Sequence, residues 1–119
     1  ATYPKQHHGN ALTPLEGQSL KPLLVSPSAT GSFPPRLLFW EHEGNRAVRD
    51  DHWKLVAKGP AGPWELYDMA ADRTEMNNLA AQQPERVKAM AAQWDAWAKR
   101  VGVRPWTEIQ AAAPKAHER

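Results

Sequence analysis

The sequence of 119 residues contains no cysteine, which excludes disulfides, a thiolate nucleophile and zinc sites of the cysteine type. No apolar run approaches the roughly 20 residues that a membrane-spanning helix needs. An excess of one charge is also lacking, because 15 basic residues stand among 13 acidic ones, for a net charge of +2. Nucleic-acid binding needs clustered cations interleaved with exposed aromatic side chains. We therefore expect neither a membrane nor a nucleic acid as partner.

The first 35 residues are rich in proline and small polar residues. Each proline removes a backbone donor and restrains the residue before it, which excludes long elements. This segment, residues 1–35, is predicted to be irregular apart from one short helical turn in residues 17–24, with Ser19 as its N-cap. The prolines are Pro4, Pro14, Pro22, Pro27, Pro34 and Pro35.

Residues 36–67 have the pattern of a small antiparallel sheet. Apolar residues fill 37–40, and alternation in 52–58 sets Trp53, Leu55 and Ala57 on one face. The four predicted strands cover 36–41, 45–49, 52–58 and 64–67. Glycine, aspartate and proline residues mark the turns between them. Short connections between neighbouring strands favour an antiparallel meander.

A helix is predicted from Pro84 to Val101, because apolar residues recur there at helical spacing and charged ones occupy the opposite face. Proline suits the first helical position, and Gly102 is a typical stop. The predicted fold is thus α+β: about four antiparallel strands with one C-terminal amphipathic helix on one face. We expect domain boundaries at 1–35, 36–104 and 105–119, the last being a frayed tail.

His42 lies between Glu41 and Glu43 at the end of the most apolar predicted strand. Polar residues at a strand end can form a site on a rigid sheet. The same triplet is also compatible with a simple turn of solvated carboxylates. A strand turns successive side chains to opposite faces, so the spacing does not favour a metal site.

Arg46, Arg49 and Lys54 could face an anion such as sulfate or carboxylate. Alternatively, they form a charged outer face that answers nearby acidic residues. The tryptophans could likewise form a platform for sugars or aromatic substrates, although their spacing favours the core for most of them. These residues are Trp40, Trp53, Trp64, Trp94 and Trp97.

Three phrases of the sequence resemble the type I sulfatases, or arylsulfatases. The run PLEGQSLKPLL looks like the phrase that ends their N-terminal catalytic domain. FWEHEGNRAVRDDHWKLV is similar to the strand–turn–strand that follows, and WELYDMAADRTEMNNLA resembles a third phrase of the family. Together they cover residues 14–101 in the family's order. By this resemblance the chain is a C-terminal subdomain of an arylsulfatase, with a small antiparallel sheet and one helix packed on it.

The resemblance also implies what this chain leaves out. The family hydrolyses sulfate esters with a formylglycine made from Cys or Ser in Cys/Ser-x-Pro-x-Arg, and with a calcium ion. The resemblance places those positions upstream, in the N-terminal catalytic domain. We therefore expect no catalytic residue and no cofactor in this chain. Calcium and formylglycine would belong to that domain of a periplasmic or secreted parent enzyme.

The ends of the hairpins lie beside the catalytic pocket in that family. The resemblance therefore makes His42, Glu43, Asn45 and Arg46 the candidate substrate contacts, with a sulfate ester as the substrate. The sheet face opposite the helix would be covered by the catalytic domain. In the separate chain that face should favour self-association. The alternative function is a free-standing module that binds an anionic glycan or another partner.

Overall fold

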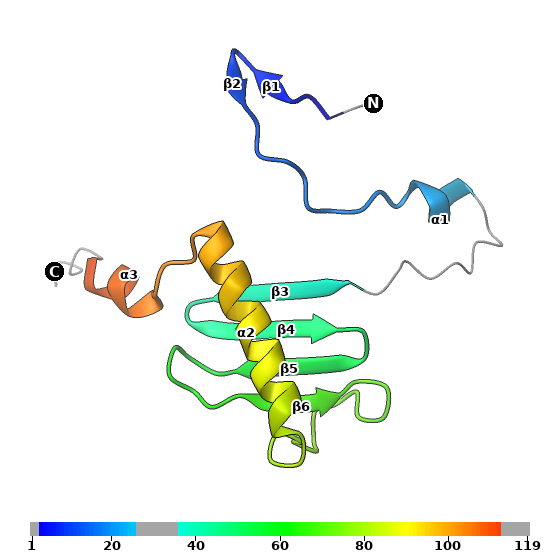
Figure 1. The fold of residues 1–119 in the computed structure, drawn as a ribbon, viewed down its shortest axis with the longest axis vertical. Helices are drawn as coiled ribbons and strands as arrows, with labels where there is room; N and C mark the ends of the chain where they lie inside the picture. Colours follow the sequence, from blue (N-terminus) through cyan, green and yellow to red (C-terminus); the bar gives the residue numbers. More distant parts are fainter. Residues whose placement is uncertain (1–2, 26–35, 113–119) are drawn as a thin grey trace, which may run out of the picture. The chain divides into compact units, whose positions relative to one another are not determined.

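The computed structural model describes residues 3–25 and 36–112 (Figure 1). Its chain divides into two compact units, Ala1–Phe33 and Pro34–Arg119. The secondary structure is α+β, as predicted, with a sheet of two strands and a sheet of four, both antiparallel.

The first unit contains a small hairpin that the sequence did not predict. Strands β1 (Gln6–His7) and β2 (Asn10–Ala11) pair across a two-residue turn. Both turn residues have positive φ, 48° at His8 and 79° at Gly9, as in the tight turns that suit hairpins. The predicted helical turn is present as α1 (Lys21–Val25), and the Ser19 hydroxyl accepts a hydrogen bond from the Lys21 amide at 3.2 Å.

The second unit is built on the predicted meander. Strands β3 (Leu37–His42), β4 (Asn45–Asp50), β5 (Trp53–Ala57) and β6 (Glu65–Asp68) lie in that order in the sheet. All neighbouring strands are antiparallel. The β3–β4 turn and the β5–β6 loop therefore lie at the same end of the sheet (Figure 1).

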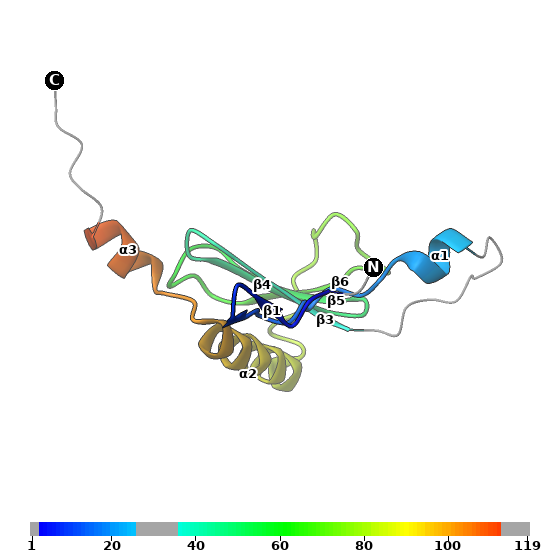
Figure 2. The same ribbon diagram turned by 90° about the horizontal axis from the view of Figure 1, so that it is seen from above.

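Helix α2 (Pro84–Val101) packs on one face of these strands (Figure 2). Val48, Leu55 and Leu66 come from three neighbouring strands, and each is 0% exposed. The helix contributes Met90, Trp94 and Ala98 to the same core. Burial of these apolar side chains is the main force that joins the helix to the sheet.

Both ends of α2 are where the sequence predicts them. Pro84 lies in the first turn, and Gly102 follows the last with φ 74°, where its amide bonds the Ala98 carbonyl. The tail differs from the prediction, because Trp106–Ala112 form a further helix, α3, instead of fraying. The Trp106 side chain is half-buried and lies against Gly44, which gives this short helix a tertiary contact.

The face opposite α2 is here called the open face. Strand alternation and the observed register place side chains on it in rows. One row is Trp40, Ala47, Val56 and Glu65, and the next is Leu38, Arg49, Lys54 and Tyr67. The loop after β6 rises on this side (Figure 2), where the Glu75 carboxylate contacts the Lys54 ammonium. No other element of the second unit's described residues covers this face (Figures 1 and 2).

Candidate functional site

The two connections at one end of the sheet are tied together by Asn45. Its side-chain amide donates to the His42 carbonyl at 2.8 Å, within its own hairpin. Its side-chain oxygen accepts from the Gly59 amide at 2.9 Å, in the β5–β6 loop. Both polar atoms of the Asn45 side chain thus bond backbone of two different connections, which fixes their positions relative to each other.

The β3–β4 turn is a two-residue connection, Glu43 and Gly44, with φ of 52° and 83°. Two consecutive left-handed residues are the mark of the type I′ turn, whose twist matches that of the flanking strands. Glu41 completes the turn, since its carboxylate accepts from the Gly44 amide at 2.8 Å. The geometry leaves the Glu43 side chain exposed at the tip.

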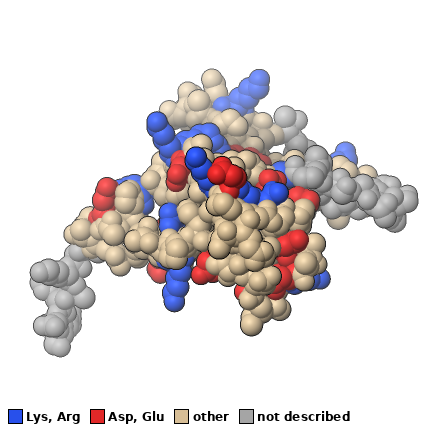
Figure 3. All heavy atoms as spheres, turned by 60° about the horizontal axis from the view of Figure 1, so that its bottom comes forward, with Lys and Arg blue, Asp and Glu red and all other residues tan. Residues whose placement is uncertain are grey.

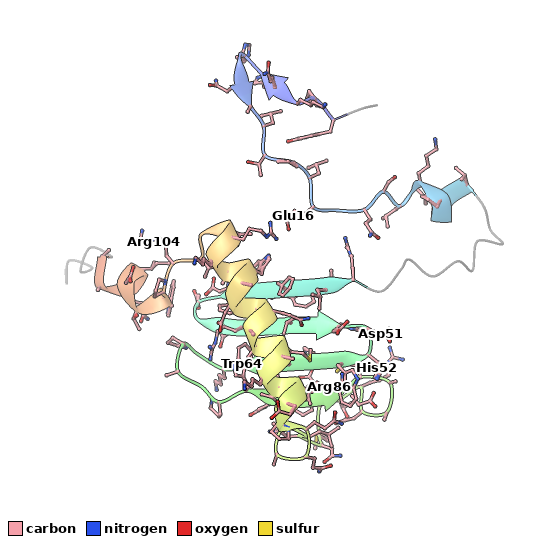
Figure 4. All side chains as sticks on the ribbon, in the orientation of Figure 1. Glu16, Asp51, His52, Trp64, Arg86 and Arg104 are labelled. Atoms are coloured by element: carbon pink, nitrogen blue, oxygen red, sulfur yellow. The ribbon has the colours of Figure 1, made fainter. Side chains whose placement is uncertain are left out.

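Arg46 fastens the β5–β6 loop from the α2 side of the sheet. Its guanidinium donates to the Gly62 carbonyl at 3.0 Å and lies 4.5 Å from the centre of the Trp64 ring. It is 5.7 Å from the Trp94 ring of α2, so both contacts are of cation–π type. Figure 4 labels Trp64 beside the helix.

A shallow hollow of about 340 Å³ opens on the open face beside this tied end. We call it the sheet-end hollow. Its floor and walls include Trp40, His42, Ala47, Val56, Lys58 and Glu65. A second hollow, of about 210 Å³, lies on the α2 side and is lined by Arg46, Trp94, Arg104 and Trp106 (Arg104 is labelled in Figure 4).

The four predicted substrate contacts do not point the same way. His42 and Asn45 line the sheet-end hollow on the open face. Glu43 occupies the turn, and the Arg46 guanidinium lies on the α2 side. Sequence reasoning missed Lys58, which follows β5 on the open face and lines the same hollow. The signal was available, because Lys58 continues the alternation of Lys54 and Val56.

The other basic candidates are partly engaged. Lys54 contacts Glu75, and the Arg49 guanidinium donates to the Asp51 carbonyl at 2.9 Å. Figure 4 labels Asp51 and His52 at the far end of the sheet from the tied connections. Arg86 of α2 lies over the Trp53 ring at 4.3 Å. Of the tryptophans, Trp94 is buried, whereas Trp40 is 48% exposed.

Among the described residues, Tyr67 and Asp72 have pKa values shifted from the ordinary ones. The Tyr67 hydroxyl donates to Glu65 at 2.7 Å, and this bond, with burial and the nearby carboxylates, raises the pKa of Tyr67 to about 12. The pKa of Asp72 is lowered, chiefly because the Asn77 amide donates to its carboxylate at 2.8 Å. Among residues 3–25 and 36–112, no group of three or more His, Cys, Asp or Glu side chains is placed to hold a metal ion.

Basic and acidic side chains are intermixed on the surface shown in Figure 3. This matches the alternation of charge along the sequence. Within the described part of the chain, no helix is long and apolar enough to cross a membrane.

No protein-family model matches the chain. Similarity to individual proteins is nevertheless clear. An uncharacterised sulfatase of Schizosaccharomyces pombe is 33% identical over 67 residues, which is 54% of this chain and 12% of the relative. Arylsulfatase K of Xenopus laevis is 35% identical over 91 residues, which is 64% of this chain and 17% of the relative.

This chain is a relative of the sulfatases. It spans less than a fifth of the length of the two sulfatases described above. The resemblance found in the three sequence phrases is thus confirmed by the comparisons.

One run of this chain has the spacing of the family's nucleophile motif. Ser32-Phe33-Pro34-Pro35-Arg36 fits Ser-x-Pro-x-Arg. The resemblance places the family's motif upstream of the phrase at residues 14–24, whereas this run follows that phrase. Its order in the chain therefore argues against a nucleophile. Ser32 lies outside the described residues.

Proposed function

We propose that this chain is the C-terminal, non-catalytic part of an arylsulfatase-type sulfuric ester hydrolase. The observation that carries the proposal is the similarity to two sulfatases over 54% and 64% of the chain, within a small fraction of their length. The absence of cysteine is consistent with a part that does not carry the Cys form of the nucleophile. Calcium and formylglycine would then belong to the catalytic domain.

The proposed role is to supply structure and one wall of the substrate site. The tied end of the sheet supports it, because side chains on rigid connections hold a fixed geometry. His42 and Asn45 would form this wall on the open face, with Glu43 at the tip. Arg46 would act by holding the β5–β6 loop, since its guanidinium already bonds Gly62.

The catalytic domain is the proposed partner, and the part of the open face beyond the sheet-end hollow is the proposed contact. Leu38 is half-buried there, so a partner could remove further apolar surface from water. In the separate chain the same face would favour pairing with a second copy.

The test joins this chain to the catalytic domain of its parent enzyme. The joined protein should hydrolyse an aryl sulfate with calcium present, and His42→Ala should raise KM more than it lowers kcat. Lys88→Ala on the exposed side of α2 is the matched control. A parent protein without sulfatase activity, or with activity unchanged on deletion of residues 36–104, would refute the proposal.

The alternative of a glycan-binding module is favoured by one observation: the exposed Trp40 ring and the Lys58 side chain line the same hollow. Retention of the separate chain on a column of sulfated polysaccharide, but not on its desulfated form, would support that alternative.

A further inference from the structure

The outer row of the open face brings three polar side chains together across three strands. His42 pairs with Asn45 in the β3–β4 register. Arg46 pairs with Ala57 in the β4–β5 register, so Asn45 stands beside Lys58 one position further on. Neighbouring strands are about 4.8 Å apart. His42 and Lys58 are therefore separated by about 10 Å, with Asn45 between them.

Apolar side chains form the inner part of the sheet-end hollow. Ala47 lies between Trp40 and Val56 in the next row, and its small side chain leaves the floor low beside a large ring. The Trp40 backbone is held from the other side of the sheet, because its carbonyl accepts from the Trp94 indole at 2.9 Å. This bond fixes the backbone that carries the ring, and the exposed ring is available for stacking.

The hydrogen-bond donors of the hollow favour a ligand with a negative group. Its carboxylates are engaged, since Glu65 accepts from Tyr67 and Glu75 contacts Lys54. Asn45 already uses both polar atoms of its side chain. Both His42 and Lys58 line the hollow, and among the described residues no side chain or carbonyl bonds the His42 imidazole or the Lys58 ammonium, so they can donate to a ligand.

We propose that the sheet-end hollow is a binding site for a ring-shaped molecule that carries a negative group. The ring stacks on Trp40 above Ala47 and Val56, and the negative group accepts from Lys58 and His42. Asn45 is a positioning residue, because it fixes the two connections that carry these donors. That the ligand is the alcohol part of the sulfate ester rests on the proposed function, whereas the site itself does not.

The experiment uses the isotope-labelled chain of 119 residues, observed by NMR. Phenyl sulfate, phenol and inorganic sulfate are the probes, and they separate the ring from the charge. Phenyl sulfate should shift the Trp40 indole and the amides of Ala47, Val56 and Lys58 at millimolar concentration. Phenol and inorganic sulfate should each bind about tenfold more weakly or less, because each lacks one of the two contacts.

Two variants locate the site. Lys58→Gln removes the charge from an exposed position and should weaken phenyl sulfate binding by about tenfold. Ala47→Leu fills the floor and should abolish the shifts. Lys88→Gln, which removes a similar charge from exposed α2, should bind like the unchanged chain.

Equal weakening in Lys58→Gln and Lys88→Gln would overturn the proposal, because it would indicate non-specific attraction. So would the absence of any shift that depends on phenyl sulfate once the chain is dilute enough to be monomeric, since a second copy would then be the only occupant. A third outcome separates the site from the proposed function. If the chain binds phenyl sulfate but Lys58→Gln leaves the joined enzyme fully active, the site stands and only its part in the enzymatic reaction is refuted.

Discussion

Position 44 requires glycine for two reasons, the backbone conformation and the close neighbouring atoms. Its φ of 83° lies in the left-handed region, where a side chain is strained. A Cβ added there would lie 2.8 Å from the Pro60 ring and 3.2 Å from the Trp106 Cβ. The turn of one hairpin, the β5–β6 loop and the start of α3 thus meet at a position with no room for a methyl group.

Gly44→Ala should destabilise the second unit by about 2–4 kcal/mol, from backbone strain plus overpacking. Gly59→Ala is the matched control, because Gly59 also has positive φ, 68°, but nothing lies within 4 Å of its added Cβ. It should cost only about 1 kcal/mol. Urea unfolding followed by circular dichroism measures both, and equal losses would contradict the tight contact with Pro60.

Tyr67 should make stability depend on pH in the alkaline range. Its pKa is raised from the ordinary 10.0 to about 12 in the folded chain. The protonated form is thus favoured by folding, and the contribution is complete below pH 10 and lost as pH rises toward 12. The melting temperature should fall over that window. Tyr67→Phe should flatten this part of the profile, and a profile that stays as steep would refute the assignment to Tyr67.

At the residue scale, the sequence predicted the surroundings of some side chains and not of others. Alternation correctly placed Leu55 and Ala57 toward the core, because a strand's period of two leaves no choice of face. It also sets Arg46 on the face of Val48, but it did not predict the partners of the guanidinium there. These are the Trp64 ring and the Gly62 carbonyl, which lie 18 and 16 positions away in the chain and become neighbours only on folding.

The helix and the sheet of the second unit depend on each other. Helix α2 buries one face of β4, β5 and β6, and the Phe39 ring of β3 stacks on Trp97 at 5.2 Å. A four-stranded meander with one bare apolar face would have marginal stability alone. The layer of α2 therefore completes the core and leaves the open face available.

Adjacent residues of β5 test this asymmetry. Leu55→Ala should cost about 2–5 kcal/mol, because Leu55 is 0% exposed against α2. Val56→Ala, on the open face, should cost markedly less, because Val56 is only half-buried. Denaturant unfolding of the two variants at low concentration makes the comparison. A similar loss for Val56 would indicate that the open face is covered in the separate chain.

Element boundaries were predictable where local chemistry sets them. Pro84 and Gly102 mark both ends of α2, since one suits the first turn and the other adopts the left-handed cap. Helix α3 has no such marks beyond Pro105, and its stability depends on the contact of Trp106 with the hairpin turn. A contact of this kind joins distant parts of the sequence and cannot be read from spacing.

At the scale of the whole molecule, the main feature is sequence similarity to sulfatases that are much longer than this chain. The chain matches two of them over more than half of its own length and less than a fifth of theirs. The resemblance to the sulfatases and the fold it implies were both predictable, because three runs of the sequence resemble that family and follow its order. The place of Lys58 in the candidate site was not predictable, because it depends on the register of three strands.

The separate chain should not hydrolyse an aryl sulfate, even with calcium added. The expected reason is that the nucleophile and the metal ligands belong to the catalytic domain. A colorimetric assay with 4-nitrophenyl sulfate measures this. Ser32→Ala is the informative variant, because Ser32 has the motif spacing. Turnover that disappears in Ser32→Ala would show that this run is a working nucleophile after all.

Self-association of the chain should follow the open face. Sedimentation velocity should show the average mass rising with concentration, and Trp40→Lys should reduce this rise, because it places a charge in the centre of the face. Glu43→Lys in the β3–β4 turn, also exposed, serves as the control for charge alone. A monomer at all concentrations that binds no hydrophobic dye would contradict the prediction.

The bond between the Trp94 indole and the Trp40 carbonyl has a mechanical consequence. It couples the helix to the edge strand through the thickness of the sheet, so a tilt of α2 would pull on the backbone beneath the exposed indole. The resonance of that indole should therefore respond to changes made on the far side of the layer. A measurement on the open face would therefore report how α2 packs on the opposite face.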